Sequence, residues 1–360
     1  MDGATIPVTT LTGFLGSGKT TVLNHLLKQP EMKGALVIVN EFGEIGLDHL
    51  LMQASEERFV LLDNGCICCT VRGDLRRTMK DLQRKVAAGE LPAFAHVVIE
   101  TTGLADPAPI LHTLMVDRDL AGHFHIGATI ATVDAVNGVA TLARHAEAAK
   151  QVAVADRLLI TKTDLASPGD IAALERRLGE LAPTATRVTA DNGKVAAGAV
   201  LGADLASQGD QPARLARWFE AACRAVTPGQ DGSDGHGPDC GCVEHGAHRH
   251  HGIASYSFII DRPIDAAAFR TWLDYVTALK GEDLLRVKGL ICLAEEPDRP
   301  LVMHGVQHVF HPPLRLAAWP SEDRRTRLVF IVRGIPRHAI ERTLVRFAAV
   351  EPASLVRSAA

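Results

Sequence analysis

The sequence predicts an α/β protein with a mostly parallel sheet and helices on both faces, followed by a smaller α+β domain. Over roughly the first 225 residues, short apolar runs alternate with amphipathic helical patterns, which is typical of a parallel sheet. Residues 227–252 then contain almost no large apolar side chains, and a second pattern follows them. At 360 residues the chain is too long for one ordinary core, so two domains are expected.

The strands of the first domain are predicted from apolar runs and its helices from apolar residues at helical spacing. The six expected strands are Val8–Leu11, Leu36–Val39, Phe59–Leu62, His96–Ile99, Ala128–Val133 and Arg157–Ile160. One expected helix carries Leu75, Met79, Leu82 and Val86 on one face, and another carries Ile171, Leu174, Leu178 and Leu181. Ser167 as N-cap and Pro168 at the first helical position predict where the second helix begins.

The C-terminal pattern predicts a small α+β domain. An alternating strand pattern at Tyr256, Phe258 and Ile260 precedes a helical stripe of Phe269, Trp272, Leu273 and Val276. Apolar runs follow at Leu284–Leu293, Leu301–Phe310 and Leu328–Val332, and a last helix carries Ile340, Leu344 and Phe347. The expected organisation is therefore a first domain over residues 1–226, a flexible linker over 227–252 and a second domain over 253–352.

The segment Gly13-Phe-Leu-Gly-Ser-Gly-Lys19-Thr20 follows an expected strand and opens an expected helix, as a phosphate-binding P-loop requires. Its glycines allow successive backbone N–H groups to converge on an anion. Lys19 would reach the β- and γ-phosphates, and Thr20 would bind Mg²⁺. The expected nucleotide-binding residues here are Gly13, Gly16, Ser17, Gly18, Lys19, Thr20 and Thr21. The alternative, a glycine-rich turn without a ligand, fits this strand–helix context poorly.

A second expected strand ends in a carboxylate at Glu100, and Gly103 follows shortly after. A P-loop NTPase needs an acid at such a position to orient Mg²⁺ and its waters, so we predict Thr20 and Glu100 as the Mg²⁺-binding pair. Lys19 and Glu100 are the predicted catalytic residues. Gly103 would let the backbone approach a γ-phosphate. The other interpretation of Glu100 is a buried strand that happens to end in glutamate.

The choice of base is predicted from Thr161-Lys162-Thr163-Asp164 after the strand at 157–160. Guanine-specific proteins carry Asn-Lys-x-Asp, in which the aspartate accepts from the guanine ring N–H and amino group. Adenine cannot donate that pair, so Asp164 would select GTP while the stem of Lys162 lies along the base. Thr161 departs from the pattern and is expected to lose a contact to the base. A solvated loop is the alternative.

Three cysteines, Cys66, Cys68 and Cys69, fall within four residues after an expected strand. Thiolates close together favour Zn²⁺, Co²⁺ or Cu⁺ over Mg²⁺, so we predict a transition-metal site; packing or redox chemistry is the alternative. Upstream, the acidic glycine-containing loop with Glu41, Glu44 and Asp48 is expected to act as a switch that senses the γ-phosphate, unless it is only a solvated acidic loop.

The expected linker is rich in imidazole and thiol groups, which are zinc, nickel or copper ligands. We therefore predict an auxiliary metal-binding tract; a polar spacer with incidental histidines is the alternative. Its candidate ligands are His236, Cys240, Cys242, His245, His248, His250 and His251.

Charge and composition exclude several classes of protein. The net charge of −4 argues against a general binder of nucleic acid or anionic membranes, and no apolar run approaches the roughly 20 residues of a membrane span. The N-terminal residues lack the features of a signal peptide. Of the seven cysteines, three lie together at positions 66–69 and two at 240–242, and such spacing in a chain without an export signal indicates metal thiolates more than disulfides. A cytoplasmic location is expected.

These motifs together resemble those of the CobW-like P-loop GTPases. GFLGSGKTT, NEFGEIGLD, GCICC, ETTGLADP and TKTD occur in that family's order, and RVKG and HGVQHVFHPP look like its second domain. The resemblance covers nearly the whole chain. It implies a GTPase, using GTP and Mg²⁺, that loads Zn²⁺ or Co²⁺ and delivers it to a client metalloprotein.

Several alternatives stay open beside a GTP-dependent metallochaperone, for which zinc is the expected metal. They are a cobalt-handling GTPase of cobalamin synthesis, a metal buffer that stores zinc in the histidine tract, and an ATP-using kinase on the same fold. A homo-oligomer is a further expectation about partners. Basal hydrolysis should be slow, because the sequence offers no obvious arginine finger in cis.

Overall fold

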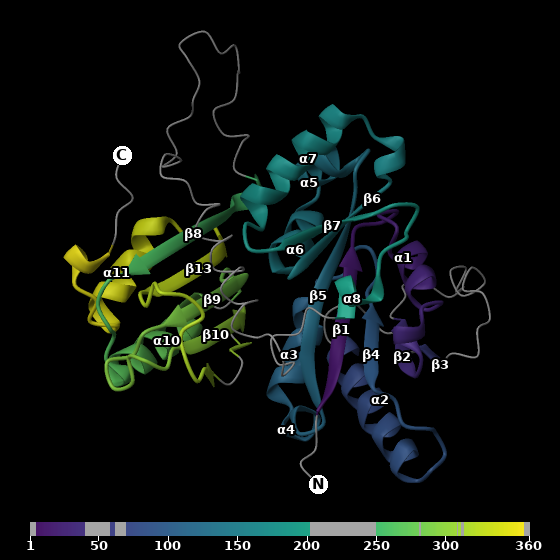
Figure 1. Cartoon of the computed structure of the whole chain (residues 1–360), viewed down its shortest axis with the longest axis horizontal. Helices are drawn as coiled ribbons and strands as arrows, with labels where there is room; N and C mark the ends of the chain where they lie inside the picture. The colour runs from purple at the N-terminus through teal and green to yellow at the C-terminus, as the bar shows by residue number, and fades with distance from the viewer. Residues whose placement is uncertain are drawn as a thin grey trace. The chain divides into compact units, whose positions relative to one another are not determined.

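The computed structural model describes residues 5–39, 58–61, 70–201, 250–280, 282–307, 309–310 and 313–355. Contacts divide the chain into two compact units, one around each of two β-sheets (Figure 1). The predicted linker at 227–252 lies almost wholly outside the described residues, so the exact domain limits stay predictions. None of the described helices is long and apolar enough to cross a membrane.

The first unit contains a seven-stranded parallel sheet with the order β3-β2-β4-β1-β5-β6-β7. Its strands are β1 (Ile6–Gly13), β2 (Ala35–Val39), β3 (Arg58–Leu61), β4 (His96–Glu100), β5 (Phe124–Asp134), β6 (Arg157–Thr161) and β7 (Thr186–Ala190). The six predicted strands are all present. The seventh, β7, is an edge strand whose polar, largely exposed residues lack the apolar run on which the prediction relied.

Helices cover both faces of this sheet, as predicted, because alternate residues of each strand point to opposite sides. Val22, Leu23 and Leu26 of α1 pack on one face, whereas Leu75 and Met79 of α2 pack on the other. The helices are α1 (Lys19–Leu26), α2 (Thr70–Ala87), α3 (Ala108–Val116), α4 (Arg118–Ala121), α5 (Gly138–Arg144), α6 (Ala146–Val154), α7 (Pro168–Leu181) and α8 (Ala197–Leu201), with short 3₁₀ turns η1 (Pro30–Met32) and η3 (Thr163–Leu165).

Helix α7 begins where its capping residues predict. The Ser167 hydroxyl accepts a hydrogen bond from the Asp170 N–H at 3.2 Å, and the Asp170 carboxylate accepts from the Ser167 hydroxyl at 2.6 Å. The Asp170 carboxylate also accepts from the Ser167 N–H at 3.3 Å, so the two side chains satisfy backbone donors at the start of the helix that have no partner within it.

The parallel arrangement places the carboxyl ends of the central strands at one edge of the sheet. β1, which lies between β4 and β5 in Figure 1, ends at Gly13. β4 ends at Glu100, β5 at Asp134 and β6 at Thr161. All the motifs predicted to contact nucleotide therefore begin at the same edge.

The second unit is the predicted α+β domain, built on a six-stranded sheet with the order β11-β10-β9-β13-β8 and β12 beside β10. Its elements are β8 (Ile253–Ile260), α10 (Ala266–Lys280), β9 (Arg286–Ile291), β10 (Leu301–Val306), β11 (Val309–Phe310), β12 (Leu314–Arg315), β13 (Thr326–Arg333) and α11 (Arg337–Phe347), with 3₁₀ turns η4 (His250–Gly252) and η5 (Pro352–Ser354). Its core centres on Trp272, which meets Phe330 edge to face and donates from its indole N–H to the Thr343 hydroxyl at 3.0 Å.

Candidate functional site

The segment Gly13–Thr20 forms a tight loop between β1 and α1. Gly16 and Gly18 have φ angles of +70° and +93°, which L side chains rarely adopt. At Gly13 the constraint is also spatial, since an added Cβ would lie 2.2 Å from the Thr132 Oγ1 on β5. The glycines therefore permit both the turn of the loop and its close packing on the neighbouring strand.

Lys19 is buried, and its ammonium is folded back onto the loop that precedes it. The Nζ donates to the Gly13 carbonyl at 2.9 Å and to the Phe14 carbonyl at 3.3 Å. This holds a positive charge beside the N-terminus of α1, where backbone N–H groups already favour an anion. The arrangement fits the phosphates of a nucleotide.

Thr20 in the first turn of α1 and Glu100 at the end of β4 come together. The Thr20 hydroxyl donates to the Glu100 Oε1 at 3.1 Å, and Glu100 is 5% exposed. A hydroxyl and a carboxylate close to a phosphate loop are the oxygen ligands that suit Mg²⁺. Thr21, the next predicted residue, is exposed, and its side chain packs against Gly193 after β7.

The residues after Glu100 lie against the phosphate loop. The Thr101 hydroxyl donates to the Thr12 hydroxyl at 2.9 Å, which ties the end of β4 to β1. A Cβ added to Gly103 would lie 2.7 Å from the Leu15 backbone nitrogen. Glycine is thus needed at position 103 for contact with the loop, in addition to the predicted approach of a γ-phosphate.

The residues of the predicted base-recognition motif occupy three different environments. Asp164 is exposed on η3, at the same edge of the sheet. Lys162 has a left-handed backbone with φ +56°, and its Nζ pairs with the Asp134 Oδ2 at 2.8 Å. Thr161 is 2% exposed and donates its hydroxyl to the Ser17 carbonyl at 2.7 Å. In this structure Thr161 supports the phosphate loop.

Asp134 at the end of β5 was not among the sequence predictions. Burial raises the pKa of its carboxyl, but hydrogen bonds from Lys162, from the Asn137 side chain and from the N–H groups of Val136 and Asn137 outweigh this. The net pKa lies below the ordinary aspartate value, so the carboxylate stays ionised. An acid ending an apolar strand, the signal that identified Glu100, could also have identified Asp134.

Ser17 points into the protein and is 3% exposed. Its Oγ lies 2.6 Å from the Thr132 Oγ1, so the hydroxyl is engaged with β5. Its backbone N–H donates to the Phe14 carbonyl at 3.1 Å. The side chain of this predicted nucleotide-binding residue therefore stabilises the loop from behind.

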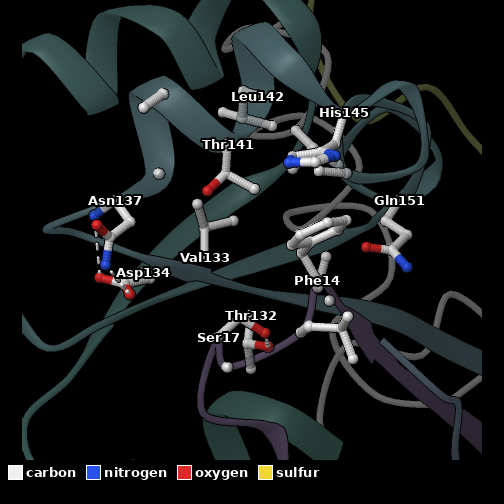
Figure 2. A pocket seen from close by; sticks show the side chains of 18 of the residues that line it. Phe14, Ser17, Thr132, Val133, Asp134, Asn137, Thr141, Leu142, His145 and Gln151 are labelled. Carbon is white, nitrogen blue, oxygen red and sulfur yellow. Dashed lines mark hydrogen bonds between the residues drawn. The ribbon is translucent and has the colours of Figure 1, made fainter. Parts of the chain in front are cut away.

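A cavity of about 350 Å³ lies between the phosphate loop, the end of β5 and the helices α5 and α6. Figure 2 shows Asp134 and Asn137 at one end of it and Phe14 and His145 at the other. The Phe14 and His145 rings stack with centroids 4.4 Å apart. Gln151, 1% exposed, completes this second end. The sequence alone did not predict this cavity.

The predicted switch and metal-binding residues fall almost entirely outside the described part of the chain. They are Glu41, Glu44, Asp48, Cys66, Cys68, Cys69, His236, Cys240, Cys242, His245 and His248. His250 is described only in its backbone, and His251 begins the approach to β8 with φ +51°. Within the described residues, no group of three or more His, Cys, Asp or Glu side chains is arranged to hold a metal ion.

Comparisons with known proteins identify both units. Residues 7–189 match the CobW/HypB/UreG nucleotide-binding domain, and residues 253–348 match the cobalamin synthesis protein CobW C-terminal domain. Over 335 residues the chain is 30% identical to the zinc chaperone YjiA of Escherichia coli, covering 93% of this chain and 96% of that protein. It is 31% identical to the zinc chaperone CobW of Pseudomonas aeruginosa over 95% of this chain and 91% of that protein.

A solved structure agrees with the sequence relatives. The Zn(II)-bound YjiA GTPase from E. coli superimposes with a TM-score of 0.68 at 26% identity, covering 96% of this chain and 99% of that one. The predicted fold class is confirmed, and the predicted GTPase activity is the one named for this relative. With its nucleotide-binding domain and its C-terminal domain both matched, the chain belongs to the CobW/HypB/UreG family of P-loop proteins.

Proposed function

We propose that this protein is a GTPase that loads zinc and passes it to a client metalloprotein, with GTP hydrolysis controlling the transfer. The observation that carries the proposal is a phosphate site and a C-x-C-C motif within one domain. The motif lies in residues 62–69, between β3 and α2 in the chain, and β3 belongs to the same sheet as the strand that leads into the phosphate loop. The zinc chaperones named among the relatives support the same function.

The nucleotide side of the proposal assigns a role to each group at the sheet edge. The N–H groups of Gly16–Thr20 and the Lys19 ammonium would bind the β- and γ-phosphates. Thr20 and Glu100 would hold Mg²⁺, which supplies charge neutralisation for phosphoryl transfer when bound. Lys162 and Asp164 would contact the guanine base. Catalysis would then be chiefly positional and electrostatic, with slow basal turnover.

The metal side of the proposal treats zinc as cargo. Cys66, Cys68 and Cys69 would supply three thiolates, which leaves a fourth coordination position for a ligand from the client. Thiolates also accept Co²⁺, so selectivity would depend on geometry and metal supply. Thiolate ligands must stay reduced, which is why we place the protein in the cytoplasm.

Coupling between the two sides would run through the loop with Glu41, Glu44 and Asp48. GTP and Mg²⁺ would order this loop and hold the thiols in a metal-binding arrangement, and hydrolysis would release both. Zinc affinity should therefore be higher in the GTP state than in the GDP state.

The test measures zinc binding and GTP hydrolysis in the full chain and in Cys68→Ala and Cys69→Ala. Both variants should lose high-affinity zinc binding and any zinc-dependent change in GTP hydrolysis. Cys292→Ala is the matched control, because Cys292 is buried in the second unit and burial raises the pKa of its thiol, which disfavours the thiolate. Unchanged zinc affinity in both motif variants would overturn the thiol site.

Three further arms separate the alternatives. Cobalt bound in preference to zinc would favour the cobalt-handling function. Loss of most metal capacity on deletion of residues 231–251 would favour the buffer, whereas retained one-to-one binding favours the chaperone. If ATP displaces bound GTP as effectively as added GTP does, the role of Asp164 is contradicted and a kinase is favoured.

A further inference from the structure

The residues that follow Glu100 are fastened to α6 by one buried side chain. The Gln151 Nε2 donates to the Gly103 carbonyl at 3.1 Å and to the Ala105 carbonyl at 3.0 Å. Two carbonyl partners use both hydrogens of the amide, so the orientation of the Gln151 side chain is determined. The residue is 1% exposed, which protects both hydrogen bonds from competition by solvent.

Two further side chains at α6 contact the residues after Glu100 and the phosphate loop. Lys150, the preceding residue, places its Nζ 2.6 Å from the Asp106 Oδ2. His145, immediately before the helix, stacks on Phe14 of the phosphate loop (Figure 2). α6 thus contacts the phosphate loop at its beginning and the residues after Glu100 further along.

These contacts constrain the backbone where a γ-phosphate is expected. In a trans peptide the carbonyl and the following N–H point in opposite directions. Because the carbonyls of Gly103 and Ala105 face α6, the N–H groups of Leu104 and Asp106 face away from it. Gly103 is at the same time in van der Waals contact with Leu15 of the phosphate loop. The amide on α6 therefore fixes how this segment presents its donors.

We propose that Gln151 is a positioning residue for GTP hydrolysis, with Lys150 as its neighbour in the same role. Its amide acts through the Gly103 and Ala105 carbonyls and sets the segment 103–106 against the phosphate loop. Phosphoryl transfer depends chiefly on such positioning, and a small misplacement can lower the rate by about 100-fold. The inference rests on the proposed location of the γ-phosphate near Glu100 and Gly103. GDP has no γ-phosphate, so its binding should not depend on Gln151.

The experiment compares the full chain with Gln151→Met, which keeps the length of the side chain and removes its donors. The matched control is Gln29→Met. Gln29 also bridges backbone groups, donating to the Val195 carbonyl at 2.7 Å and accepting from the Ala197 N–H at 2.7 Å, but it lies beyond the C-terminal end of α1. Steady-state GTP hydrolysis, the affinities for GDP and a non-hydrolysable GTP analogue, and thermal unfolding are measured for each.

Gln151→Met should lower kcat at least about tenfold and weaken analogue binding, with GDP affinity within about twofold of the original. Gln29→Met should leave all three nucleotide parameters unchanged even if it unfolds at a lower temperature. Equal kcat in the two variants, or a parallel loss of GDP and analogue affinity in Gln151→Met, would overturn the proposal. Absence of GTP hydrolysis in the unaltered chain would instead contradict the proposed function.

Lys150→Met decides the question if Gln151→Met does not fold. The Lys150 side chain is 19% exposed and its ion pair lies at the margin of the segment, so its replacement should leave the fold intact. A kcat lowered about threefold at unchanged GDP affinity supports positioning by α6. A kcat equal to that of the unaltered chain overturns it.

Discussion

Replacing Thr161 with valine should weaken the binding of GDP and GTP equally. Valine keeps the shape of the side chain but loses the hydroxyl that donates to the Ser17 carbonyl at 2.7 Å. Thr161 is 2% exposed, so the carbonyl would lose its partner in a buried site, at a cost of about 1–3 kcal/mol. If roughly 1.4 kcal/mol of this is expressed as displacement of the phosphate loop, affinity for either nucleotide falls about tenfold.

The assay combines urea unfolding with titration of fluorescent GDP and a GTP analogue. Thr113→Val is the matched control: its hydroxyl donates to the Pro109 carbonyl at 2.9 Å within α3, where that carbonyl also has a helical N–H within reach. The control should lose less than about 1 kcal/mol and bind nucleotide normally. Unchanged GDP affinity in Thr161→Val, or a loss confined to the triphosphate, would refute the assignment of Thr161 to loop support.

Two further predictions concern packing and charge. Gly103→Ala should impair GTP hydrolysis at least about tenfold, because its Cβ would clash with the Leu15 backbone. Gly198→Ala is the control and should leave hydrolysis unchanged, because a Cβ added there would meet no other part of the chain within 4 Å. Equal activities in the two variants would contradict the packing argument. Asp323→Asn should be less stable than the original at pH 7 and lose less stability on acidification to pH 3, by urea midpoint. Hydrogen bonds from Arg325 hold the folded-state pKa of Asp323 well below the unfolded value near 3.9. The carboxylate therefore contributes to the free energy of unfolding above about pH 4, and this contribution is lost as the pH falls below that value. An identical loss of stability on acidification in both proteins would refute the prediction.

The sequence predicted the architecture well because the strands of the parallel sheet are buried on both faces. Leu36–Val39 and Val97–Ile99 are apolar runs for that reason, and glycine spacing located the phosphate loop. β7 escaped prediction because an edge strand needs no such run: Thr186, Arg187 and Thr189 are exposed. Thr161 was interpreted as a weakened base contact, whereas the fold places its hydroxyl beneath the phosphate loop.

The role of α6 could not be predicted from its own sequence. Ala146–Val154 contains six alanines and valines around Gln151, and a glutamine in such a helix is ordinarily a surface residue. Its partners, Gly103 and Ala105, lie more than forty positions away, so only the folded chain reveals the contact. The predicted Cys66, Cys68 and Cys69 site depends on residues outside the described ranges and stays a prediction.

Hydroxyl groups brace the phosphate loop from three neighbouring strands, and this has a kinetic consequence. Thr12, near the end of β1, accepts from Thr101 directly after β4. The Ser17 hydroxyl contacts Thr132 of β5, and the Ser17 carbonyl accepts from Thr161 of β6. Because these contacts already order the loop, nucleotide binding costs little conformational entropy there. Association of GDP and GTP should then be similarly fast, and discrimination between them should reside in how long each stays bound. The residence time of the nucleotide would set the interval during which cargo can be held.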